Sequence, residues 1–136
     1  MLILLVVIGA IVAAVLVWPK ADCEASAGSC SASPQTTRAE TILNEIKTGE
    51  AALIDVREPD EYAVGHAPSS ILFPLGDIEA GKFELMDKDK KLYLYCRSGN
   101  RAGIAEDALQ RQGYTNVENL GGLSDWQSLG GELVTN

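Results

Sequence analysis

The chain has 136 residues, 46% of them hydrophobic, and a formal net charge of −8. That length accommodates one ordinary domain and an appendage, so no second domain is expected. Residues 37–136 alone carry 10 Lys and Arg against 17 Asp and Glu, a balance of −7. This acidic balance argues against nucleic-acid binding, which relies on clustered Lys and Arg side chains.

The chain begins with an apolar run, residues 2–18, that contains no charged or strongly polar side chain. Its seventeen residues are close to the minimum that spans a bilayer, and the run ends in Trp-Pro-Lys, which supplies an interfacial aromatic ring, a helix stop and a charge. We therefore expect residues 1–19 to form a transmembrane helix that anchors the chain. A cleaved signal is the alternative, because Ala25-Ser26-Ala27 resembles a cleavage site, although it lies far from the apolar run.

Residues 20–36 are rich in Ala, Ser, Thr, Gly and Pro without periodicity, which is typical of a flexible tether. Cys23 and Cys30 lie in this tether. In an oxidising compartment they could close a small disulfide loop or could remain ordinary cysteines of the tether, and in the cytosol we expect them to stay reduced. We expect a membrane-anchored protein with its domain in the periplasm or an equivalent oxidising space. An exported soluble periplasmic protein and a cytoplasm-facing domain are the alternatives.

From residue 37 onward, predicted helices and strands alternate. Thr37-Arg38-Ala39-Glu40 is a capping box that begins a helix, and Gly49 is suited to end it. Such alternation predicts a three-layer α/β domain over residues 37–136, with a mostly parallel sheet, helices on both faces and ligands outside the carboxyl ends of the strands. The expected elements after the first helix are a strand over 51–56, a helix starting within 58–61, a strand over 70–73, a short helix within 75–83, a strand over 92–95, a helix over 102–112, a strand over 117–120 and a final helix containing Trp126 and Leu129.

The strand over 92–95 leads into Cys96, a polar loop and then a helix. Backbone N–H groups of such a loop, together with the helix N-terminus, form a concave site for anions. The same field, with Arg97 and Arg101 nearby, favours thiolate over thiol. A lone cysteine after an apolar run is often a small buried hydrophobe, but a structural cysteine needs no flanking Gly, Ser, Asn and two Arg. We therefore interpret Cys96 as a nucleophile that meets an anionic substrate.

The loop Cys96-Arg97-Ser98-Gly99-Asn100-Arg101 resembles the active-site loop of single-domain rhodanese-type sulfurtransferases. Two further groups of residues agree with that family in order and spacing over about residues 37–136, and the joint pattern is far more specific than any one piece. Upstream of the loop these are Asp55-Val56-Arg57-Glu58, Glu61-Tyr62 and Gly65-His66-Ala67-Pro68, and downstream they are Gly113-Tyr114, Asn119-Leu120-Gly121-Gly122 and Trp126.

The resemblance implies a sulfurtransferase in which Cys96 is the catalytic residue. Its thiolate would attack the outer sulfur of thiosulfate or a related donor, sulfite would leave, and the enzyme persulfide would pass its sulfur to cyanide or a thiol in a ping-pong reaction. No cofactor or metal is implied. The loop residues Arg97, Ser98, Gly99, Asn100 and Arg101 would bind the substrate, with their N–H groups acting as an oxyanion hole acts in acyl transfer.

Within the loop, we expect Arg97 to project to the pocket mouth and meet the incoming anion. Arg101 closes the loop where the helix begins, so we expect it to hold the shape of the loop. His66, the only histidine, resembles a structural turn of the family, and a nucleophile that is already a thiolate needs no general base. Asp55 and Arg57 are interpreted first as a structural charge pair at a strand end.

Two other functions stay open. A rhodanese-fold module could deliver a persulfide to a partner as a sulfur carrier, without turnover of its own. A Cys-dependent phosphatase or arsenate reductase is the other alternative, but the family comparison associates phosphatases with a Cys-x5-Arg loop, whereas the spacing here is Cys-x4-Arg. One departure from the family pattern is Ser69, which stands where a Gly usually follows the His-x-Pro turn.

Overall fold

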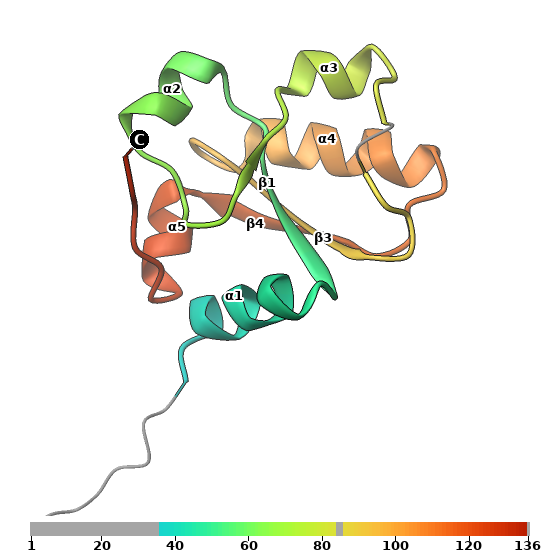
Figure 1. The fold of residues 1–136 in the computed structure, drawn as a ribbon. Coiled ribbons are helices and arrows are strands. Elements are labelled where there is room, and N and C mark those ends of the chain that lie inside the picture. Colours follow the sequence, from blue (N-terminus) through green and yellow to red (C-terminus); the bar gives the residue numbers. More distant parts are fainter. Residues whose placement is uncertain (1–35, 84–85, 136) are drawn as a thin grey trace, which may run out of the picture. The chain divides into compact units, whose positions relative to one another are not determined.

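The computed structural model describes residues 36–83 and 86–135. Strands and helices alternate along this part of the chain, as the sequence predicts (Figure 1). The elements in chain order are α1 (Arg38–Thr48), β1 (Ala51–Asp55), α2 (Pro59–Val64), β2 (Ile71–Leu72), α3 (Leu75–Glu79), β3 (Lys91–Cys96), α4 (Asn100–Arg111), β4 (Val117–Gly122) and α5 (Leu123–Ser128).

The strands of the described part form one sheet in the order β2-β1-β3-β4, and every neighbouring pair is parallel. Asp55 of β1 lies opposite Tyr95 of β3. The pairing of β3 with β4 shifts register between Leu94 and Cys96, so that Cys96 lies opposite Gly122. The carboxyl ends of β1, β3 and β4 therefore meet at one end of the sheet, which is where parallel α/β folds bind ligands.

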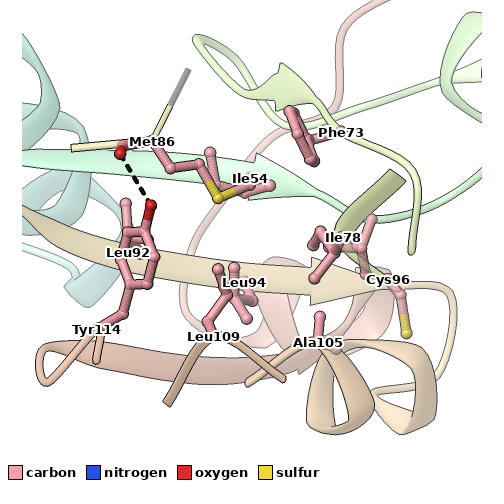
Figure 2. Packing of buried hydrophobic residues seen from close by; sticks show 12 residues of the cluster. Ile54, Phe73, Ile78, Met86, Leu92, Leu94, Cys96, Ala105, Leu109 and Tyr114 are labelled. Atoms are coloured by element: carbon pink, nitrogen blue, oxygen red, sulfur yellow. Dashed lines mark hydrogen bonds between the residues drawn. The ribbon is translucent and has the colours of Figure 1, made fainter. Parts of the chain in front are cut away.

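Two buried clusters cover the two faces of the sheet, because side chains alternate along each strand. Tyr93 and Tyr95 of β3 face α1 and α5, where Trp126 is fully buried. Leu94 and Cys96 belong to the opposite cluster, which includes residues of α3 and α4. Figure 2 shows this second cluster, with Cys96 at its margin where β3 ends. The predicted three-layer arrangement is thus confirmed.

The helix α1 begins and ends at the residues that the sequence indicates. The Thr37 side chain accepts a hydrogen bond from the Glu40 backbone N–H at 3.2 Å, and the Glu40 carboxylate accepts one from the Thr37 N–H at 2.8 Å. Gly49 follows the helix with a φ of 82°, the left-handed conformation in which glycine has no steric cost. Both predicted caps are therefore confirmed.

Several predicted boundaries differ from the structure by one or two residues. The expected strand over 70–73 shortens to Ile71–Leu72, and the strand expected to end at residue 120 continues to Gly122. The helix after the loop starts at Asn100 rather than at residue 102. Gly99 accounts for the earlier start, because its φ of 87° turns the chain directly from the loop into the helix.

The predicted anchor (residues 1–19), nearly all of the tether (residues 20–36), Cys23 and Cys30 lie outside the described residues. Over residues 36–83 and 86–135, no helix has the length and apolar character needed to cross a membrane. The membrane anchor, the disulfide and the localisation stay predictions.

Candidate active site

Cys96 is the last residue of β3 and belongs to the apolar cluster beneath α4. The residue is 1% exposed, while the next two, Arg97 and Ser98, are exposed. The Gly99 backbone N–H donates a hydrogen bond to the Cys96 sulfur at 3.1 Å. The strand thus delivers the sulfur to the base of the loop, where a main-chain donor already meets it.

The loop leads into the N-terminus of α4, a helix of 12 residues. Gly99 occupies the N-cap position, no side chain caps the helix there, and the first turn holds no acidic residue. The first N–H groups of a helix lack intrahelical partners and carry the positive end of the helix dipole. Cys96 therefore lies beside an uncapped helix N-terminus, which is a favourable place for a sulfur anion and an anionic donor.

The end of β4 holds the loop from the other side. Asn119 donates from its side-chain amide to the Gly99 carbonyl oxygen at 3.2 Å and accepts from the Gly121 N–H at 2.8 Å. Gly122 packs against the loop backbone, since a Cβ at this position would lie 2.5 Å from the Arg97 carbonyl oxygen. Gly122, which the sequence indicates as part of a simple turn, is thus required for the close approach of β4 to the loop.

Replacing Gly122 by alanine is expected to displace the loop, because the atoms that the new methyl group meets at Arg97 and Ser98 belong to the backbone. A shift of this kind lowers the rate of a positioned reaction by about tenfold or more. Steady-state sulfur transfer, the activity that the sequence resemblance implies, is the measurement. Gly76→Ala is the matched control, because a Cβ there has no atom within 4 Å. Equal rates for the two variants would contradict a need for glycine beside the loop.

Arg101, in the first turn of α4, forms a bidentate ion pair with Glu61 of α2. The two nitrogen–oxygen distances are 2.6 and 2.9 Å, and both side chains are about one quarter exposed. Hydrogen bonding to Arg101 lowers the pKa of the Glu61 carboxyl to about 2. Hydrogen bonding to Glu61, with a smaller contribution from attraction to Cys96, raises the pKa of Arg101. Because the folded-state pKa of Glu61 is depressed, the pair stabilises the fold fully above pH 4.5 and loses its effect as the pH falls toward 2.

Asp55 and Arg57 form a second, fully buried pair at the end of β1, with side chains 0% and 4% exposed. The Arg57 guanidinium donates to both Asp55 carboxylate oxygens, at 2.6 to 3.0 Å, and the Arg57 N–H donates to one of them. It also donates to the Glu61 and Gly65 carbonyl oxygens at 3.2 and 2.7 Å. The predicted structural charge pair is confirmed, and it ties α2 to the sheet.

His66 lies in a structural turn, as the sequence predicts. Its Nδ1 is 3.0 Å from the Tyr62 carbonyl oxygen, and its ring stacks on the Tyr62 ring with the centroids 3.7 Å apart. Its backbone exchanges hydrogen bonds with Val134 at 2.8 and 2.9 Å. The next residues are held by Tyr95, whose hydroxyl accepts from the Ala67 N–H and donates to the Ser70 hydroxyl, both at 3.1 Å. Burial raises the pKa of Tyr95, which keeps this hydroxyl protonated.

A shallow cavity of about 220 Å³ opens beside the loop. Its lining combines two apolar side chains, Val64 and Leu123, with the charged Arg57, Glu61 and Arg97. Arg57 and Arg101 are held by carboxylates, whereas Arg97 forms no ion pair with any of the described residues. Arg97 is thus the arginine at this cavity whose charge is open to an incoming anion.

The structure brings together the residues that the sequence assigns to the loop. Cys96 and Arg97–Arg101 form one continuous turn, in which Arg97 is exposed and Arg101 is paired with Glu61 of α2. Sequence reasoning placed Glu61 and Asn119 only within the family pattern and missed their contacts with the loop. For Glu61, the available indication of a role was its place in the family pattern, three positions after Glu58. For Asn119, the adjoining Gly-Gly pair was the signal.

Comparisons with known proteins identify the family of the domain that carries this loop. The family model described as a rhodanese-like domain matches residues 38–129. The thiosulfate sulfurtransferase PspE of Escherichia coli is 40% identical over 73 residues, which is 53% of this chain and 70% of that protein. A putative sulfur carrier protein of Bacillus subtilis, YrkF, is 32% identical over 105 residues, covering 76% of this chain and 56% of its own length. The chain therefore spans little more than half of that relative.

Among solved structures, a rhodanese with anions from E. coli aligns with a TM-score of 0.56 at 33% identity, over 63% of this chain and 99% of the other. The match of the family model covers well over half of the chain, and the sheet, the helices and the cysteine loop lie inside the matched residues. The chain belongs to the rhodanese-like domain family.

Proposed function

We propose that the protein is a sulfurtransferase that moves a sulfane sulfur from thiosulfate or a related anionic donor to cyanide or a thiol through a persulfide on Cys96. The observation that carries this proposal is the hydrogen bond from the Gly99 N–H to the Cys96 sulfur at an uncapped helix N-terminus. Main-chain donors in this position stabilise both the thiolate and the anion that forms on the outer sulfur of a persulfide. The exposed Arg97 adds attraction for an anionic donor.

The proposed reaction needs no oxidant or reductant. The Cys96 thiolate attacks the outer sulfur of thiosulfate, a sulfur–sulfur bond forms to Cys96, and the bond between the two donor sulfurs breaks so that sulfite leaves with its electron pair. Cyanide or a thiolate then attacks the terminal sulfur of the persulfide, and Cys96 leaves as the thiolate. The low exposure of Cys96 restricts access to small reagents, which suits a donor the size of thiosulfate.

The test is intact-mass analysis of the purified chain before and after thiosulfate. We expect the mass to rise by one sulfur atom, with the modification on the peptide that contains Cys96. Addition of cyanide should remove this sulfur and form thiocyanate in equal amount. An unchanged mass after thiosulfate, or hydrolysis of p-nitrophenyl phosphate by the same preparation, would contradict the proposal.

A sulfur-carrier role is the second candidate, since one relative is named a putative sulfur carrier protein. The two roles share the persulfide and differ in the fate of its outer sulfur. An enzyme passes the sulfur repeatedly to small acceptors, whereas a carrier holds the persulfide until a partner protein takes it. A persulfide that forms once with thiosulfate and persists in the presence of cyanide and small thiols would favour the carrier.

Replacing Arg97 by alanine is expected to raise the KM for thiosulfate by about three- to tenfold with little change in kcat. The reason is that an exposed charge contributes modestly and equally to ground-state and transition-state binding. Steady-state kinetics at varied thiosulfate concentration measure it. Arg111→Ala is the matched control, because Arg111 is exposed at the other end of α4 and the loss of charge is the same. Similar KM values for the two variants would exclude the assigned role of Arg97.

A further inference from the structure

Glu61 connects α2 to the first turn of α4 across forty positions of sequence. An arginine in the first turn of a helix faces the positive end of the helix dipole, which disfavours its charge there. The two terminal nitrogens of the Arg101 guanidinium bind the two carboxylate oxygens of Glu61. This bidentate geometry fixes the orientation of the side chain and also balances its charge. Glu61 therefore determines where the Arg101 side chain lies.

The carboxylate itself rests on a fixed support. Arg57 holds the backbone of α2 through the Glu61 and Gly65 carbonyl oxygens, and the buried Asp55 holds Arg57. The Glu61 carboxylate also accepts a hydrogen bond from the Glu58 N–H at 3.3 Å. A continuous series of polar contacts thus runs from the end of β1, through α2, to the helix turn after the cysteine loop.

The first turn of α4 adjoins the backbone N–H group that donates a hydrogen bond to the Cys96 sulfur. Arg101 lies two residues after Gly99, the N-cap residue whose N–H reaches the Cys96 sulfur. Any displacement of the first turn of α4 therefore changes the position of this N–H. Pairing with Glu61 also neutralises Arg101, so that Arg97 supplies the open positive charge at the cavity.

We propose that Glu61 is a positioning residue of sulfur transfer: through Arg101 it fixes the cysteine loop against α2, and it keeps the Arg101 charge from competing with Arg97 for the anionic donor. This inference rests on the proposed function for its catalytic consequence. Its structural part, that Glu61 balances a charge beside Cys96, does not depend on the identity of the donor.

The experiment uses Glu61→Gln in the purified full-length chain. The first measurement is the single-turnover rate constant of persulfide formation with thiosulfate, which does not depend on the fraction of active protein. We expect it to fall about ten- to a hundredfold, as small displacements of reacting groups do. Glu118→Gln is the matched control, because it removes a carboxylate from an ion-paired site with Arg38 and Lys91 and should leave the rate unchanged.

The second measurement needs no sulfur donor. Alkylation of the Cys96 peptide by iodoacetate, relative to iodoacetamide, reports the charge beside the sulfur. Glu61→Gln leaves the Arg101 charge unbalanced, so the ratio should rise about two- to fivefold, whereas Glu118→Gln should not change it. If the wild-type chain forms no persulfide but the alkylation ratio still rises in Glu61→Gln, the proposed function is rejected and the structural part of this inference is retained.

A double-mutant cycle tests the route through Arg101. If Glu61 acts through that residue, adding Glu61→Gln to Arg101→Gln changes the rate constant by less than about twofold, because both substitutions remove one interaction. Full additivity of the two effects would overturn the inference. An unchanged alkylation ratio in Glu61→Gln would overturn it as well.

Discussion

Cys96→Ser is expected to abolish both the addition of sulfur from thiosulfate and the formation of thiocyanate. A serine hydroxyl is a far weaker nucleophile than a thiolate and needs a general base to activate it. His66 packs against Tyr62 in a structural turn, and we give it no such role. Loss of a covalent nucleophile lowers turnover by more than about 10³-fold. Thiocyanate release under saturating thiosulfate and cyanide measures the rate, and intact mass measures the persulfide.

The control for this variant is the same substitution at Cys23, which lies outside the described residues and should leave the rate unchanged. Cys96 is packed in an apolar cluster, so the introduced hydroxyl costs stability, by about 1–3 kcal/mol on mutational scales. Thermal unfolding of Cys96→Ser and Cys96→Ala separates this cost from the lost chemistry. Turnover in Cys96→Ser near the wild-type rate would show that the sulfur of another residue, or another mechanism, carries the reaction.

The fold was predictable because its signals are local. The capping box at Thr37, the left-handed Gly49 and the alternation of apolar runs each depend on residues close together in sequence. The cysteine loop was predictable for the same reason, since the strand, the loop and the helix that build it lie within residues 91–111. Only the element ends moved, by one or two residues.

The contacts that hold the loop were not predictable from local patterns. Glu61 meets Arg101 forty positions away, and Asn119 reaches Gly99 twenty positions away. Glu61 lies in the helix that follows β1 and Asn119 lies in β4, so both contacts exist only once the strands have their order and register. The Gly-Gly pair had a local explanation as a turn, and this concealed its role in the approach of β4 to the loop.

Ser69 shows how a family departure acquires a physical meaning. It adopts a φ of 62°, and among the described residues it is the non-glycine with a positive φ. Left-handed backbone costs a side-chain-bearing residue roughly 1–2 kcal/mol, which explains why glycine is usual after the His-x-Pro turn. The turn keeps its form here because Ser70, Tyr95 and Ala67 are joined by hydrogen bonds directly beside it.

These contacts make the end of the sheet a single polar support for the cysteine loop. The buried Asp55–Arg57 pair holds α2, α2 presents Glu61, and Glu61 holds the first turn of α4. The cysteine loop thus depends on a buried carboxylate at the end of β1, and we expect the largest stability effect of the site at Asp55.

Asp55→Ala is expected to destabilise the fold by about 3–5 kcal/mol, because it leaves the Arg57 guanidinium buried without its carboxylate. Hydrogen bonding and attraction to Asp55 outweigh the effect of burial and raise the pKa of Arg57. Asp55→Ala removes this support, but arginine keeps its charge in proteins at neutral pH, so a buried unpaired guanidinium remains. Total domain stabilities are about 5–15 kcal/mol, so the loss is large enough to unfold a marginal chain. Urea denaturation of the purified protein at pH 7 measures the free energy of unfolding.

Asp77→Ala is the matched control, since Asp77 pairs with Lys82 at an exposed site, with side chains 41% and 63% exposed. Breaking that pair should change the free energy of unfolding by less than about 1 kcal/mol. The double variant Asp55→Leu/Arg57→Met should recover only part of the loss, because an apolar pair leaves no buried charge, whereas the Glu61 and Gly65 carbonyl oxygens lose their donor. Equal losses of unfolding free energy in Asp55→Ala and Asp77→Ala would mean that burial does not increase the contribution of the Asp55–Arg57 pair to stability. Other contacts would then have to hold α2 against the sheet.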